Sequence, residues 1–162
     1  MDDVAARLQG KQLSRTGAHF DDLEPGPLSL LSMFEYFIGN TDADFLAALK
    51  QAVTDFAGVY ISWGASENNW DPSVLDEFEA VIKSAADRDV PVFVAAGDTG
   101  SQDSSGAGNQ ADFPASSPSA IGCGGTRLEL NGAERASETV WDDNPTQSAT
   151  GGGVSKHFPG RQ

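Results

Sequence analysis

Apolar and polar positions between residues 33 and 96 follow two alternating patterns. Short runs of aromatic and β-branched residues at 33–38, 59–63 and 90–96 are typical of buried strands. Between these runs, apolar residues recur three or four positions apart, which indicates helices that pack on one face. The order strand, helix, strand, helix, strand predicts a parallel sheet with flanking helices and right-handed crossovers, and therefore an α/β fold.

Both predicted helices begin at residues that suit a helix N-terminus. Thr41 can cap the first helix, and Asp71 can cap the second helix, with Pro72 at its first position. The residues expected on the buried faces are Phe45, Leu49, Val53 and Phe56 in the first helix and Leu75, Phe78, Ile82 and Ala85 in the second. Each helix is therefore expected to present one apolar face to the sheet.

The second half of the chain is predicted to be loop-rich, with a hairpin towards its C-terminal end. Residues 120–123 form a short apolar strand, in which Cys123 is expected to be a buried small hydrophobe. Residues 128–140 predict a hairpin that turns at Asn131-Gly132. The glycines at 151–153 are typical of a flexible connector, although they also permit the close approach of another segment.

Length and composition indicate how many domains the protein has and which kinds of partner it disfavours. The 162 residues suit one domain with a sizeable core. Residues 1–32 show the weakest pattern and contain a breaker rich in proline and glycine, so we separate them from residues 33–162. A net charge of −14 argues against partners that present phosphate, both nucleic acid and anionic membrane. The chain has no apolar run long enough for a membrane helix, and its start lacks the features of a signal peptide.

The histidines, the cysteine and the acidic residues of the second predicted helix are expected to have structural and not functional roles. One cysteine and two histidines predict neither an internal disulfide nor a metal site. His157 has no visible partner and is expected at the surface. Asp76, Glu77 and Glu79 are expected on the solvated face of the second helix.

Function in a parallel α/β sheet gathers in the loops that follow the carboxyl ends of the strands. Ser62-Trp63-Gly64 and the loop that begins at Gly97-Asp98 occupy such positions. Taken alone, Asp98 suits an ordinary turn. A phosphate-binding loop is disfavoured because Asp98 would repel the anion and no lysine follows it. Asp98-Thr99-Gly100 also matches the motif of aspartic peptidases, but those enzymes need two such aspartates on all-β folds.

Several uncommon motifs occur in a fixed order along residues 33–159. They are Ser62-Trp63-Gly64, Ala95-Ala96-Gly97-Asp98-Thr99-Gly100, Asp112-Phe113-Pro114-Ala115, Cys123-Gly124-Gly125-Thr126, Glu138-Thr139-Val140-Trp141 and Gly151-Gly152-Gly153-Val154-Ser155. Together they resemble the sedolisin family of serine-carboxyl peptidases. The resemblance implies part of a subtilisin-like parallel sheet with flanking helices, and residues 33–162 as a partial peptidase domain.

The resemblance also implies roles for individual residues. Asp98 stands where this family carries its oxyanion-hole residue, which makes Asp98 the candidate catalytic residue. A carboxyl group donates a hydrogen bond only when it is protonated, so activity in acid is expected. Residues expected to contact a peptide or protein substrate are Ser62, Trp63, Gly64, Gly97, Phe113, Pro114 and Ala115. For Trp63, substrate binding and core packing both stay open.

The sequence departs from the family pattern at three places. It contains no Gly-Thr-Ser, which carries the family's nucleophile, and no Glu-x-x-x-Asp precedes Met33. The family's calcium loop would lie further downstream, so no cofactor is expected here. We therefore expect a fragment or decayed copy of a serine endopeptidase, inactive alone. The alternative is a non-catalytic, peptide-binding remnant. The family is usually extracellular or found in acidic compartments, and the chain itself indicates no localisation.

Overall fold

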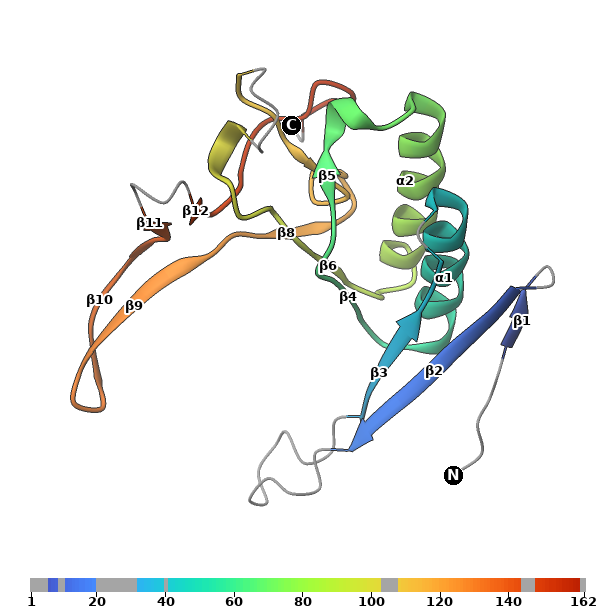
Figure 1. The fold of residues 1–162 in the computed structure, drawn as a ribbon, viewed down its shortest axis with the longest axis horizontal. Coiled ribbons are helices and arrows are strands. Elements are labelled where there is room, and N and C mark those ends of the chain that lie inside the picture. Colours follow the sequence, from blue (N-terminus) through green and yellow to red (C-terminus); the bar gives the residue numbers. More distant parts are fainter. Residues whose placement is uncertain are drawn as a thin grey trace. The chain divides into compact units, whose positions relative to one another are not determined.

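A computed structural model describes residues 6–8, 11–19, 32–39, 41–102, 108–143 and 148–160 (Figure 1). The chain forms two compact units, residues 1–51 and residues 52–162. The first unit contains an antiparallel sheet and most of one helix. The second unit contains a parallel sheet, a second helix and a hairpin, together with all the candidate site residues.

The first unit is built on a three-stranded antiparallel sheet in the order β1-β2-β3. Its strands are β1 (Ala6–Leu8), β2 (Lys11–His19) and β3 (Ser32–Phe37). The strand predicted at 33–38 is therefore present, but the prediction that it opens a parallel sheet is wrong, because β3 pairs antiparallel with β2. Alternation of side chains identifies a strand without specifying its partner, since either pairing direction uses the same period of two residues.

Helix α1 (Asp42–Asp55) begins where the sequence predicts it. The Asp44 backbone N–H donates to Thr41 Oγ1 at 3.2 Å, and the Thr41 hydroxyl donates to Asp44 Oδ2 at 2.7 Å. The first bond satisfies a backbone N–H that a helix N-terminus would otherwise leave without a partner. Leu49 and Val53 are each 3% exposed, which confirms them on the buried face.

The second unit is organised by a parallel sheet in the order β4-β6-β8. Its strands are β4 (Val59–Ile61), β6 (Val92–Ala95) and β8 (Ile121–Cys123). Helix α2 (Pro72–Ala86) lies between β4 and β6 in the chain, as expected for a crossover between parallel strands. The Ser73 backbone N–H donates to Asp71 Oδ1 at 2.8 Å, which confirms Asp71 as the cap. The predicted buried face is confirmed at Leu75, Phe78, Ile82 and Ala85.

The two faces of this parallel sheet differ in exposure. Val59, Ile61, Val92 and Val94 are buried, whereas the positions between them form a second, more exposed face. On that face Tyr60, Phe93 and Ile121 lie in register across the three strands. Tyr60 is 79% exposed and stacks on Phe93 with ring centroids 4.9 Å apart. The predicted burial of Cys123 is wrong, because Cys123 pairs with Ala95 on this exposed face.

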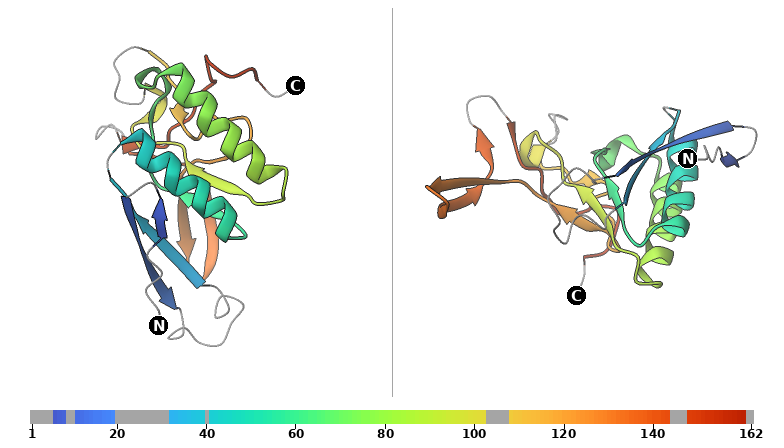
Figure 2. Two further views of the ribbon diagram at one scale, coloured as in Figure 1. Left: turned by 90° about the vertical axis from the view of Figure 1, so that its right-hand side faces the viewer. Right: turned by 90° about the horizontal axis from the view of Figure 1, so that it is seen from below.

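The predicted hairpin is confirmed as β9 (Thr126–Asn131) and β10 (Glu134–Val140). Gly132 has a φ of 64°, a left-handed conformation that favours glycine at the turn. Figure 2 shows the hairpin extending away from the parallel sheet.

Four short strands and two short helices complete the second unit. Strand β5 (Ala65–Ser66) pairs with β7 (Asp112–Phe113), and β11 (Asp142–Asp143) pairs with β12 (Ser148–Ala149), in both cases antiparallel. The two 3₁₀ helices are η2 (Glu67–Asn69) and η3 (Gly100–Gln102). The β5–β7 pair joins segments that lie far apart in the sequence, and it positions the loops around the candidate site.

Candidate functional site

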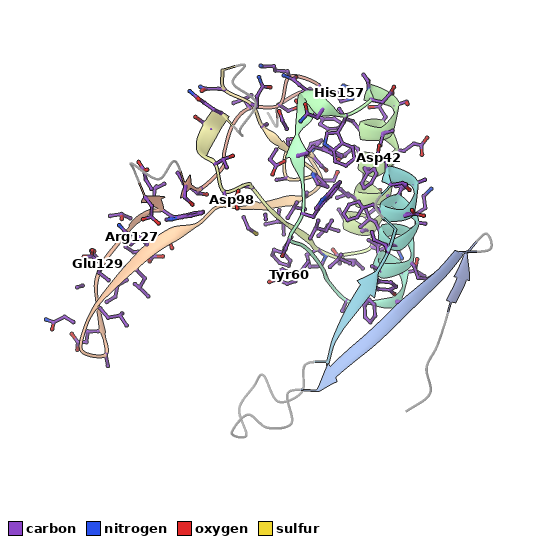
Figure 3. All side chains as sticks on the ribbon, viewed as in Figure 1. Asp42, Tyr60, Asp98, Arg127, Glu129 and His157 are labelled. Atoms are coloured by element: carbon purple, nitrogen blue, oxygen red, sulfur yellow. The ribbon has the colours of Figure 1, made fainter. Side chains whose placement is uncertain are left out.

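Asp98 lies just beyond the carboxyl end of β6, and its side chain is exposed (Figure 3). The neighbouring parallel strand β4 ends at Ile61, immediately before Ser62. Parallel neighbours place their carboxyl ends at one edge of the sheet, so the Ser62 and Asp98 loops leave the sheet at the same edge. Gly97 has a φ of 98°, and this left-handed conformation turns the chain just before Asp98.

The glycine-rich segment packs against the backbone beside Asp98. The Gly151 N–H donates to the Gly97 carbonyl at 2.8 Å, and the Ala149 N–H donates to the Asp98 carbonyl at 3.0 Å. A Cβ at Gly151 would lie 1.7 Å from the Ala96 carbonyl oxygen. The prediction of a flexible connector is therefore wrong, because Gly151 allows two backbones to approach closely. This contact supports the turn that carries Asp98.

Ser62, Trp63 and Gly64 connect β4 to β5. Ser62 is exposed, and Trp63 is 44% exposed with its ring edge-on to Trp70 at a centroid distance of 5.4 Å. Trp63 therefore combines packing with exposure, and both sequence-based interpretations of it stay open. A Cβ at Gly64 would lie 2.7 Å from the Phe113 carbonyl oxygen. The structure thus brings this motif against the segment that contains Phe113.

The segment Phe113-Pro114-Ala115 contributes to the core more than to the surface. Phe113 is fully buried, and Pro114 is among the largest fully buried side chains. The Phe113 ring lies 5.2 Å from Trp70, 5.8 Å from Phe78 and 5.9 Å from Phe158, measured between ring centroids. Ala115 is half-buried. The expected contact of this segment with substrate stays a prediction.

Glu67 is a buried carboxylate that sequence reasoning missed. It is 5% exposed and lies at the start of η2, three residues after Gly64. Its carboxylate accepts hydrogen bonds from the hydroxyls of Ser116 and Ser155 and from the backbone N–H groups of Lys156 and His157. Burial alone would raise the pKa of Glu67, but these four bonds outweigh it and lower the pKa below its ordinary value of 4.5.

No local signal in the sequence identifies this carboxylate, because its partners lie 49 to 90 residues away. Partners that are distant in the sequence also explain why two further predictions are wrong. His157 was predicted to lack a partner, but its Nε2 lies 2.8 Å from Asp76 Oδ1. Glu79 was predicted on a solvated face, but it accepts hydrogen bonds from the hydroxyls of Ser117 and Ser119. The exposure predicted for Asp76 and Glu77 is confirmed.

Among the described residues, no group of three or more His, Cys, Asp or Glu is arranged to hold a metal ion. No helix in the described ranges is long and apolar enough to cross a membrane.

Comparison with known proteins tests the resemblance. The chain is 45% identical to kumamolisin from Bacillus sp. (strain MN-32) over 129 residues, which cover 76% of this chain. This chain belongs to the sedolisin family. No family model matches the sequence.

A solved structure supports the sedolisin assignment. It is a Pseudomonas sedolisin described as a serine-carboxyl proteinase complexed with two molecules of pseudo-iodotyrostatin. It matches 73% of this chain with a TM-score of 0.66 and 28% identity. The predicted α/β class and subtilisin-like fold are thereby confirmed. The chain spans 23% of kumamolisin and 36% of the Pseudomonas sedolisin chain.

Proposed function

We propose that this sedolisin-family chain forms part of the substrate cleft of a serine-carboxyl peptidase, in which Asp98 stabilises the oxyanion in acid. The observation that carries the proposal is the position of Asp98. It is exposed at the carboxyl end of β6, beside the edge where β4 continues into Ser62-Trp63-Gly64. This arrangement supports the proposal, because Asp98 and the segment that follows β4 lie at one edge of the sheet.

The chemistry follows from the charge that develops during peptide hydrolysis. Attack on the scissile carbonyl forms a tetrahedral intermediate whose oxygen carries negative charge, and a donor aimed at that oxygen contributes about 10²–10³ in rate. Protonated Asp98 can donate, whereas ionised Asp98 would repel the oxyanion. The sequence contains no Gly-Thr-Ser. The proposal therefore assigns oxyanion stabilisation and substrate binding to this chain and leaves nucleophilic attack to a serine outside these motifs.

The substrate would be a peptide in an extended conformation. The segment that leaves β4 at Ser62 offers backbone groups to such a peptide, in the manner of strand addition to a sheet edge. Trp63 and Ala115 are the candidate side chains with exposed surface beside this segment.

A chimera tests the oxyanion role. Residues 33–159 of this chain would replace the matching segment of the Pseudomonas sedolisin, and peptide cleavage would be measured in acid. We expect Asp98→Ala to lower kcat by about 10²–10³-fold. We expect Asp98→Asn to retain cleavage and to lose the decline in activity with rising pH, because an amide donates at any pH.

Glu77→Ala on the exposed face of α2 is the matched control, and cleavage by the chimera should not change in this variant. An active chimera in which Asp98→Ala cleaves as fast as the parent would refute the role of Asp98.

The second candidate function is peptide binding without cleavage. The absence of Gly-Thr-Ser from the sequence favours it. It predicts that the full chain binds an extended peptide at about pH 4 and leaves it intact, which calorimetry followed by mass spectrometry of the peptide would show. Cleavage that disappears in Asp98→Ala would exclude this alternative.

A further inference from the structure

The Glu67 carboxylate uses both of its oxygens as acceptors. Oε1 accepts from Ser116 Oγ at 2.8 Å and from Ser155 Oγ at 2.6 Å. Oε2 accepts from the backbone N–H of Lys156 at 2.8 Å and from that of His157 at 3.3 Å. An acceptor buried among four donors fits the ionised carboxylate, since protonation would place a hydrogen where the oxygens now accept.

Three segments meet at this carboxylate. The first follows Gly64 through β5, and its position is supported by the Glu67 N–H, which donates to the Ala111 carbonyl at 2.9 Å. The second contains Ser116, directly after the Phe113-Pro114-Ala115 motif. The third is the turn at residues 155–158, which Ser155 Oγ closes by accepting from the Phe158 N–H at 2.7 Å.

Aromatic rings of these segments also pack against one another. The Phe158 ring stacks on Phe113 at 5.9 Å, and the Trp70 ring lies edge-on to both Phe113 and Trp63. The segments that meet at Glu67 therefore include a ring that packs against Trp63 and the Phe113 carbonyl beside Gly64.

We propose that Glu67 is a positioning residue of the candidate substrate cleft, whose buried carboxylate holds the segment after Gly64, the segment at Ser116 and the turn at 155–158 in one arrangement. Only the assignment of these segments to a substrate cleft rests on the proposed function. The anchoring itself rests on the hydrogen bonds alone, so it can be tested without any substrate.

The elements around Glu67 contribute both positively and negatively charged groups. The 155–158 turn contributes Lys156 and His157, β7 contributes the buried Asp112, and α2 contributes Asp76, which pairs with His157, and Glu79. The largest single influence on the pKa of Glu67 is burial, which raises it, but the hydrogen bonds together lower it.

The sign of the pH dependence follows from this lowered pKa. A carboxylate with a lowered pKa in the folded state stabilises the fold above its ordinary pKa, and the stabilisation is lost as the pH falls through the folded value. Because its pKa is lowered, the Glu67 carboxyl is protonated only at a lower pH than an ordinary glutamate.

Amide hydrogen exchange of the full chain, measured by NMR across a pH series, tests the inference. In Glu67→Gln, we expect the protection factors of the Lys156 and His157 amides to fall about tenfold or more, while amides of α2 keep their protection. Glu77→Gln is the matched control and should leave both sets unchanged. Uniform loss across the chain, or no loss at residues 156 and 157, would overturn the inference.

Ser155→Ala is a second variant, which removes one hydrogen-bond donor to Glu67. It tests the inference if Glu67→Gln does not fold. Because the Ser155 hydrogen bond lowers the pKa of Glu67, its removal should raise the midpoint of the Glu67 carboxyl ¹³C shift. An unchanged midpoint would overturn the inference.

Failure of the proposed peptidase function would be seen in a different experiment, the chimera, where Asp98→Ala would leave cleavage intact. That result would not change the hydrogen-exchange or the ¹³C measurement.

Discussion

The aromatic cluster of Trp70, Phe78, Phe113 and Phe158 and the β9–β10 hairpin show two ways of building structure in the same unit. The cluster joins rings from separate segments, and all four residues are buried. The hairpin is exposed on both strands, and its side-chain bonds, such as Ser137 to Glu129, join near neighbours in sequence. Long-range burial therefore organises the surroundings of the site, whereas the hairpin depends on local pairing.

Asp98 lies between these two kinds of structure. Its strand β6 belongs to the buried sheet, while its carbonyl accepts from Ala149, in the segment that returns from the hairpin. The turn that carries Asp98 is therefore held by a buried strand on one side and by the Gly151 contact on the other.

The largest expected effect comes from truncating the centre of the aromatic cluster. Phe113→Ala removes a fully buried ring and should lower the free energy of unfolding by about 3–5 kcal/mol, because a cavity remains among its neighbours. Urea unfolding of the full chain, followed by tryptophan fluorescence, measures this change. Tyr60→Ala is the matched control, since Tyr60 is exposed and should cost less than about 1.5 kcal/mol. Equal costs for the two variants would contradict the comparison.

A smaller effect is expected where the segment after the hairpin meets the sheet. Gly151→Ala would place a methyl group against the Ala96 carbonyl, and overpacking of this kind costs about 1–3 kcal/mol. Gly152→Ala is the control, because a Cβ there meets nothing within 4 Å and should change stability by less than about 0.5 kcal/mol. Thermal unfolding by circular dichroism would compare them. Equal stability of the two variants would show that the Gly151 contact does not form.

The smallest effect is expected in the hairpin itself. Leu130 is 60% exposed, so Leu130→Thr should change the free energy of unfolding by less than about 0.5 kcal/mol. Leu75→Ala in α2, where the side chain is 2% exposed, should cost about 2–5 kcal/mol in the same urea experiment. A loss above about 2 kcal/mol in Leu130→Thr would mean that the hairpin packs against another surface in solution, and the contrast would fail.

Parts of the fold were predictable wherever the deciding contacts are local. The Asp71 cap and the β9–β10 hairpin each depend on residues only a few positions apart. The cap was predicted correctly, and the turn lies one residue beyond the predicted Asn131-Gly132, because Asn131 pairs with Glu134. The ordered motifs identified the family without any structure. The pairing of β3 was not predictable, because its apolar pattern is the same whether the neighbouring strand runs parallel or antiparallel.

Some features of the candidate site were likewise predictable from the sequence, and others were not. Motif order and short-range periodicity were enough to identify the family, the first residues of both helices and the place of Asp98 after a buried strand. Three features became evident only from the folded structure: Glu67 is buried, His157 pairs with Asp76, and Cys123 is exposed. The physical reason is that burial and hydrogen bonding depend on partners which folding brings together from positions far apart in the chain.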